Sequence, residues 1–110
     1  MRYIELAAET AAAGTDGRSY FIGAVAQRRD GAIVRSRNLL TRVPVHSAHA
    51  EARLCKKIDL GSTVYIARVL RTGATALAKP CPKCHALLRS KGVKKVFFTT
   101  ETGEIASIEP

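Results

Sequence analysis

The spacing of apolar and polar positions in the first third of the chain predicts a helix followed by a β-hairpin. In residues 2–13 the apolar side chains Ile4, Leu6, Ala7 and Ala11 recur near helical spacing. Residues 18–37 then contain two strand-like apolar runs on either side of Asp30-Gly31, a dipeptide typical of tight hairpin turns. We therefore expect one helix and two paired strands before the chain reaches its middle.

The rest of the chain alternates short helices with β-branched strands. Ser47 is the expected N-cap of the first of these helices, while Pro82 suits the first turn of the second and Gly92 ends it. The elements expected after the hairpin are a helix over 48–58, a strand over 62–71, a helix over 82–88 extending toward Gly92, a strand over 93–100 and a returning strand over 101–108. The order α-ββ-α-β-α-β-β predicts an α/β fold in which helices cover one mixed five-stranded sheet.

Length and composition limit the class of protein. The 110 residues suffice for one compact domain, 1–110, and 46% of them are hydrophobic, enough for a core. No apolar run has the length that spans a bilayer, and Glu5 and Glu9 argue against a secretory signal, so we expect no membrane association and a cytoplasmic protein. The net charge of +9 favours phosphate-bearing partners as much as it favours mere solubility.

The pair Cys81 and Cys84 carries the clearest chemical signal. This spacing serves a redox pair, half of a structural zinc site or half of a catalytic one. A catalytic zinc needs three protein ligands and one open position, and the chain offers three histidines as the third ligand: His46, His49 and His85. His49 differs from the other two because a carboxylate, Glu51, follows it by two positions.

Two segments together resemble a known family. "HAE", residues 49–51, and "PCPKC", residues 80–84, match the H-x-E…P-C-x-x-C signature of the zinc-dependent cytidine deaminases. The resemblance covers about residues 18–108, and it is closest to short phage-encoded deaminase-like proteins, especially in "RVPVHSAHAEARL". It implies a three-layer α-β-α domain whose last two strands form an antiparallel hairpin.

The resemblance also implies roles for individual residues. His49, Cys81 and Cys84 are expected to bind Zn²⁺, and Glu51 is expected to act as the proton shuttle rather than as a ligand. Zinc-bound hydroxide is the expected nucleophile at C4 of cytosine, and the products are a uracil ring and ammonia. The backbone N–H of Ala50 is expected to hold the carbonyl group of the base.

Five further residues are candidates for substrate binding. Asn38 matches a family residue that contacts the sugar, although asparagine after a strand is also an ordinary turn residue. His46 either lines the pocket or lies on the surface, and Phe21 is a base-stacking candidate for which a place in the core is the favoured interpretation. Arg37 and Arg42 flank the loop after the second strand, where they suit a phosphate.

Three functions follow as hypotheses. The leading one is deamination of cytosine in a small nucleoside or nucleotide, namely cytidine, deoxycytidine or a monophosphate of either. The second is deamination of single-stranded DNA or RNA, which the +9 charge favours and the six Phe and Tyr residues, with no Trp, disfavour. The third is a zinc-stabilised nucleic-acid-binding domain without turnover, against which Glu51 argues. The resemblance further implies a homo-oligomer, either a dimer or a tetramer.

Overall fold

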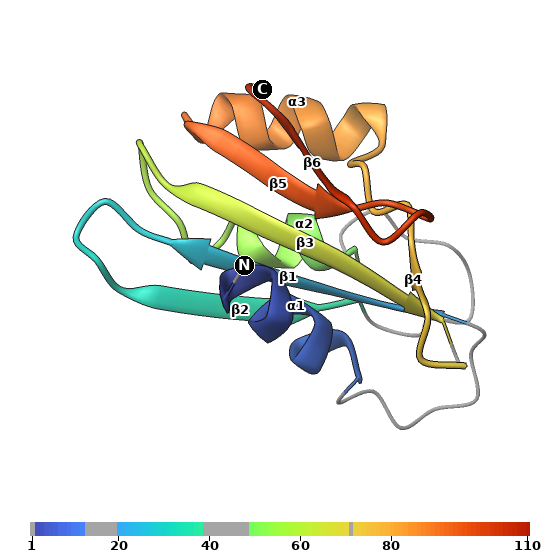
Figure 1. Ribbon diagram of the computed structural model, residues 1–110. Coiled ribbons are helices and arrows are strands. Elements are labelled where there is room, and N and C mark those ends of the chain that lie inside the picture. Colours follow the sequence, from blue (N-terminus) through green and yellow to red (C-terminus); the bar gives the residue numbers. More distant parts are fainter. Residues whose placement is uncertain (1, 13–19, 39–48, 71) are drawn as a thin grey trace.

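The computed structural model describes residues 2–12, 20–38, 49–70 and 72–110. In these ranges the chain forms three helices and six strands, and the strands make one sheet (Figure 1). No helix within them has the length and apolar character needed to cross a membrane. The elements are α1 (Arg2–Ala12), β1 (Tyr20–Gln27), β2 (Ile33–Arg37), α2 (Ala50–Leu54), β3 (Thr63–Leu70), β4 (Thr75–Ala76), α3 (Pro82–Ser90), β5 (Lys95–Thr99) and β6 (Ile105–Ile108).

The sheet is mixed, with the strand order β2-β1-β3-β5-β6. β1 pairs antiparallel with both β2 and β3, β3 pairs parallel with β5, and β5 pairs antiparallel with β6. The mixed sheet and the C-terminal hairpin are thereby confirmed. The sheet has a sixth strand that the sequence pattern does not predict: β4 pairs antiparallel with the end of β3 and has only two residues, too few to show any alternation.

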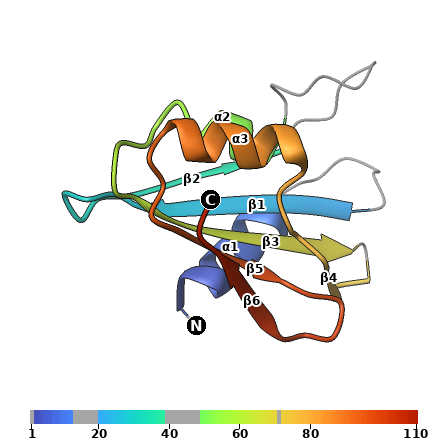
Figure 2. The same ribbon diagram turned by 90° about the horizontal axis from the view of Figure 1, so that it is seen from above.

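Helices cover both faces of the sheet, as the three-layer prediction requires. α1 lies on one face, while α2 and α3 lie together on the other (Figure 2). Side-chain alternation explains this arrangement, because Tyr65 and Ala67 of β3 pack with α1 whereas Val64 and Ile66 join the core under α2 and α3. The face that carries α2 and α3 also carries the residues of chemical interest.

Gly23 allows α1 to lie close against β1. A Cβ atom at this position would stand 2.0 Å from the carbonyl oxygen of Ala7 and 2.6 Å from the amide nitrogen of Ala11. Both contacts are with helix backbone, which cannot rotate out of the way as a side chain can. The sequence at this position therefore sets the distance between the helix and the sheet.

We expect Gly23→Ala to lower the free energy of unfolding by about 3 kcal/mol, because the added methyl group forces the helix away from the sheet. Urea denaturation followed by circular dichroism measures the change. Ser107→Thr is a suitable control, since it also adds a methyl group but at an exposed position of β6, and its expected effect is within about 0.5 kcal/mol. Equal stability of the parent and Gly23→Ala would contradict the close packing.

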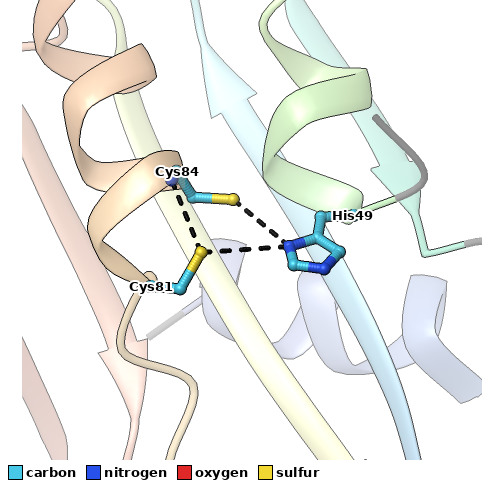
Figure 3. A group of neighbouring side chains, drawn as sticks. All are labelled: His49, Cys81 and Cys84. Carbon is cyan, nitrogen blue, oxygen red and sulfur yellow. Dashed lines mark hydrogen bonds between the residues drawn. The ribbon is translucent and has the colours of Figure 1, made fainter. Parts of the chain in front are cut away.

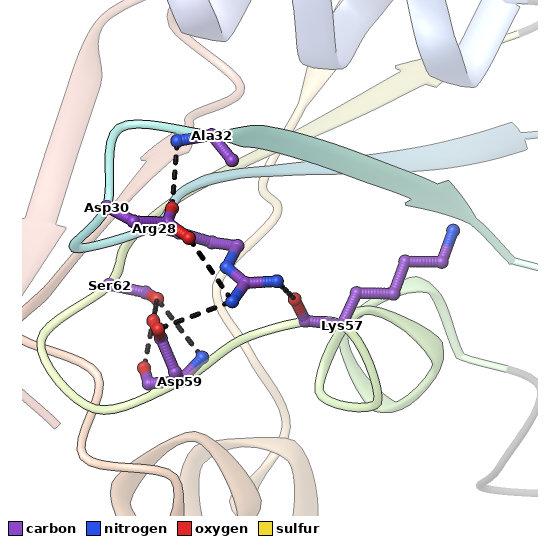
Figure 4. A network of polar contacts seen from close by, with 6 residues as sticks. All are labelled: Arg28, Asp30, Ala32, Lys57, Asp59 and Ser62. Carbon is purple, nitrogen blue, oxygen red and sulfur yellow. Dashed lines mark hydrogen bonds and ion pairs between the residues drawn. The ribbon is translucent and has the colours of Figure 1, made fainter.

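The turn of the first hairpin is tied to the loop between α2 and β3. Arg28 reaches the carboxylates of Asp30 at 3.4 Å and Asp59 at 3.5 Å, and it donates a hydrogen bond to the main-chain oxygen of Lys57 (Figure 4). Ser62 donates to the main-chain and side-chain oxygens of Asp59, and this hydrogen bond is the largest cause that lowers the pKa of Asp59. These contacts hold the loop that leads from α2 into the central strand.

Cys55 is the C-cap residue of α2, and its side chain is buried in the core. Burial raises the pKa of its thiol to about 11, an effect that the nearby Lys91 partly offsets. Because the thiolate is the reactive form, we expect Cys55 to resist iodoacetamide at pH 8 in the folded protein. Its reactivity should increase as the pH approaches 11, or when urea unfolds the chain. Mass spectrometry of the labelled peptides measures this; rapid labelling of folded protein at pH 8 would contradict the burial.

Candidate active site

Two helix starts meet on the same face of the sheet and bring three donor side chains together. His49 is the N-cap residue of α2, Cys81 is the N-cap residue of α3, and Cys84 lies in the first turn of α3. The amide of Cys84 donates to Cys81 Sγ at 3.5 Å, so this sulfur takes the place of an oxygen cap. The predicted start of α3 at Pro82 is confirmed.

The prediction of Ser47 as the N-cap of the preceding helix is wrong, because His49 holds the N-cap position of α2. The imidazole makes no capping hydrogen bond and instead lies against the two sulfurs. Ser47 itself lies outside the described residues. The helix therefore starts later than the sequence predicts, and its N-cap residue places a donor nitrogen beside the two sulfurs.

The geometry of this group fits a zinc ion. His49 Nδ1 lies 3.5 Å from Cys84 Sγ and 4.0 Å from Cys81 Sγ, and all three donor atoms lie within 4.8 Å of one another (Figure 3). A tetrahedral ion with sulfur at about 2.3 Å and nitrogen at about 2.0 Å separates these donors by about 3.6 Å. Two thiols and an imidazole are also the donor types that zinc prefers. The three residues can therefore hold a metal ion while leaving further coordination positions to other ligands.

Burial shapes the electrostatics of the donor group. Desolvation raises the pKa of the Cys84 thiol far above its ordinary value, and the charge of Glu51 raises it further. Both effects favour the protonated thiol. A divalent cation reverses this balance because it binds the thiolate, so metal binding at this group is coupled to the release of protons.

A cavity of about 140 Å³ lies beside the donor group. Its described lining residues come from the first hairpin, α2, β3 and the segment before α3: Ile22, Asn38, His49, Glu51, Arg68, Leu77, Ala78, Lys79 and Cys81. Glu51 is only 5% exposed although it carries a carboxylate, and its charge acts on Cys84. The structure thus places a buried acid next to the donor group and on the wall of the adjoining cavity.

Asn38 and Ala50 occupy fixed positions near the cavity. The Asn38 side-chain oxygen accepts a hydrogen bond of 2.9 Å from the main-chain N–H of Ile22, and the main-chain N–H of Asn38 donates to the Ile22 carbonyl. Ala50 is the first residue of α2, and Ser36 Oγ donates to its carbonyl at 2.6 Å. Its N–H belongs to the helix positions that have no carbonyl partner inside the helix.

The other sequence candidates lie elsewhere. Alternation along β1 puts Phe21 on the face of α1, while its neighbour Ile22 lines the cavity, and this favours the structural interpretation of Phe21. His46 and Arg42 lie outside the described residues, so their roles stay predictions. His85 does not belong to the donor group, and its Nε2 atom lies 3.5 Å from a guanidinium nitrogen of Arg89.

Two cationic residues of the cavity are not among the sequence candidates. Arg68 stands in the apolar strand β3 on the same face as Val64 and Ile66, and Lys79 precedes the Pro80-Cys81 pair. An arginine within an otherwise apolar strand is the signal that could have identified the first. Lys79 carries no comparable signal, because a lysine in a loop is ordinary surface.

The fold is that of solved cytidine deaminases. The enzyme from Burkholderia pseudomallei matches with a TM-score of 0.70 at 15% identity, covering 96% of this chain and 88% of that chain. The enzyme from Mycobacterium leprae matches with a TM-score of 0.64 at 17% identity, covering 94% and 88%. The enzyme from Mycobacterium tuberculosis matches with a TM-score of 0.54 at 23% identity, covering 90% and 82%.

At these identities the similarity defines the class of fold: the chain has the mixed α/β fold of the cytidine deaminases, with a His/Cys/Cys group that can hold a metal ion. No family model and no curated protein matches the sequence. The resemblance to short phage-encoded proteins stays a prediction.

Proposed function

We propose that the protein is a zinc-dependent deaminase that converts cytosine to uracil in a small nucleoside or nucleotide. The observation that carries this proposal is the buried side chain of Glu51 on the wall of a cavity that is also lined by His49 and Cys81. A closed structural metal site has no need of a buried acid that is not a ligand. The solved structures with this fold are named as cytidine deaminases, which supports the same reaction.

His49, Cys81 and Cys84 would hold the zinc ion, because their donor atoms already lie close to tetrahedral spacing. When bound, zinc supplies a Lewis acid that makes a water molecule nucleophilic near neutral pH. The first turns of α2 and α3 direct their N-termini toward this point, which favours the thiolates. This arrangement supports a zinc site whose donor atoms already lie together before the ion binds.

Glu51 is the general acid and base of the proposed reaction. Its carboxylate accepts a proton from the attacking water and delivers it to N3 of the ring. It then carries the proton of the new C4 hydroxyl to the amino group, so that the C4–N bond breaks, ammonia leaves and the C4 carbonyl of uracil forms. Because Glu51 is buried and lines the cavity, it can reach both the water and the base without competing solvent. Asn38 and the N–H of Ala50 are proposed to orient the sugar and the base carbonyl.

The test is a substrate panel with purified, zinc-loaded protein. Cytidine, deoxycytidine and their 5′-monophosphates are incubated separately, and the products are identified by mass and by ammonia release. We expect at least one of them to yield its uracil counterpart and ammonia in equal amounts. Stoichiometric zinc with no product from any of the four would contradict the proposal.

Single-stranded nucleic acid is the second candidate substrate. Beside the net charge of +9, a groove next to the sheet edge at β2 is lined by Arg35, Arg37, Arg53 and Lys57 together with Glu9. However, Arg53 and Lys57 donate hydrogen bonds to the main-chain oxygens of Arg37 and Arg35, so both cations also serve to cover the edge strand. We therefore place the small-molecule substrate first.

A homo-oligomer, either dimer or tetramer, and a cytoplasmic location are also proposed. Light scattering of the zinc-loaded protein tests the first, and a mass of one chain at all concentrations would contradict it. We also propose that residues 1–110 form a single domain.

A further inference from the structure

A second groove opens beside the cavity, on the side of α3. It has a volume of about 540 Å³ and is lined by Lys79, Pro80, Pro82, His85, Ala86 and Arg89, which we call the Lys79 groove. Lys79 lines both this groove and the cavity beside the donor group. The two spaces therefore adjoin at this side chain.

The volumes indicate which part of a ligand each space can take. Pockets that enclose a whole drug-sized ligand measure about 300–1,000 Å³. The cavity beside the donor group has about 140 Å³, so it suits a single base-sized ring and leaves the remainder of a larger ligand outside. The Lys79 groove is the adjoining space that is large enough for that remainder.

The charges of the groove indicate which chemical group of the ligand lies outside the cavity. Lys79 and Arg89 are cations, and His85 lies one helical turn before Arg89, with 3.5 Å between their side-chain nitrogens. Among the groove residues that the structure describes there is no carboxylate. Lys79 is exposed, and within the described part of the chain it takes part in no hydrogen bond or ion pair. An ammonium and a guanidinium around one space are suited to a phosphate.

The cavity itself also has an excess of positive charge, although a smaller one. Its described lining contains two cations, Arg68 and Lys79, and one acid, Glu51. A neutral nucleoside brings no charge to this environment, whereas a nucleotide brings one or two negative charges. Electrostatic complementarity thus favours the nucleotide at the cavity and at the groove together.

Resting on the deaminase function proposed above, we infer that the Lys79 groove binds the phosphate of a cytosine nucleotide whose base occupies the cavity. Lys79 and Arg89 contact the phosphate and determine specificity for nucleotide over nucleoside. The shared chemistry is a phosphate group, which either a free nucleotide or a single-stranded oligonucleotide can supply.

The experiment compares nucleotide with nucleoside in the zinc-loaded protein. Values of kcat/KM are measured for deoxycytidine, its 5′- and 3′-monophosphates, and a short oligodeoxynucleotide with one cytosine. We expect at least one phosphorylated substrate to be preferred over deoxycytidine, and Lys79→Met or Arg89→Met to reduce that preference about tenfold. Lys79→Arg should retain most of it, because the positive charge stays. Preference for a monophosphate identifies a free nucleotide as the source, and preference for the oligonucleotide identifies a strand.

Lys94→Met is the matched control. It removes the same charge from an exposed lysine that follows the C-terminal end of α3, opposite the end at which Cys81 begins the helix, and it should leave the preference unchanged. A preference unaffected by Lys79→Met and Arg89→Met, or reduced equally by Lys94→Met, would overturn the assignment of the groove.

A binding measurement separates this inference from the deaminase function. Calorimetric titration of zinc-loaded Glu51→Gln with deoxycytidine and with its 5′- and 3′-monophosphates compares affinities without turnover. Tighter binding of a monophosphate, lost with Lys79→Met, would support the phosphate site even if no substrate is deaminated. Equal affinities for deoxycytidine and both monophosphates would overturn it even if deaminase activity is found.

Discussion

Glu51→Gln is expected to reduce turnover of the cytosine substrate roughly 10³-fold, within the range of about 10²–10⁴ that general acid–base catalysis contributes. The amide has nearly the same size as the carboxylate and fits the same buried position, so the zinc content and the fold should remain. It cannot accept the proton from water or deliver it to the ring. Ammonia release, zinc content and circular dichroism on one preparation measure all three properties.

Glu104→Gln is the matched control for this experiment. It makes the same chemical change at an exposed residue in the turn that precedes β6, and it should leave turnover unchanged. Activity of Glu51→Gln within a factor of two of the parent would exclude the proposed role. Loss of zinc together with activity would point instead to a role for Glu51 in holding the metal group together.

His49→Ala is expected to weaken zinc binding by more than about 100-fold, since the loss of an outer-shell partner alone costs about 10–100-fold. This substitution is preferable to replacement of Cys84, which is fully buried and whose removal disturbs the core. His49 is exposed and precedes α2, so the fold should persist. Competition with a chromophoric zinc chelator measures the affinity, and turnover should fall in parallel.

His85→Ala serves as the control for zinc affinity. It removes a histidine that directly follows a proposed ligand, but this side chain lies outside the donor group and near Arg89. Its zinc affinity should equal that of the parent. Unchanged zinc affinity in His49→Ala, or an equal loss in both variants, would contradict the proposed ligand set.

The fold is largely predictable from sequence because its main elements have strong local signals. Asp30-Gly31 marks the first hairpin, Pro82 and Gly92 bound α3, and the C-terminal strands follow from their apolar residues. At the end of α3 the amide of Val93 donates to Leu88 and that of Gly92 to Arg89, the hydrogen bonds typical of a glycine-ended helix. β4 is not predictable because two residues show no periodicity. The start of α2 is not predictable because His49 is not a typical N-cap residue.

The candidate site is predictable where a motif marks it and obscure where tertiary structure alone creates it. His49, Glu51, Cys81 and Cys84 stand out because two short patterns with complementary chemistry occur in one chain. Arg68 lines the cavity because one face of β3 lies toward α2 and α3. Lys79 lines it because the segment before α3 forms part of the cavity wall. No spacing within the sequence predicts that these two residues line the same cavity.

The two halves of the donor group come from chain positions 32 residues apart, on separate helices. An ion bound between them links the two ends of the intervening segment, which contains the central strand β3. Ligation that exists only in the native state raises its stability in proportion to the logarithm of free ion concentration. Thermal resistance and catalytic competence should consequently rise and fall together as the supply of zinc changes.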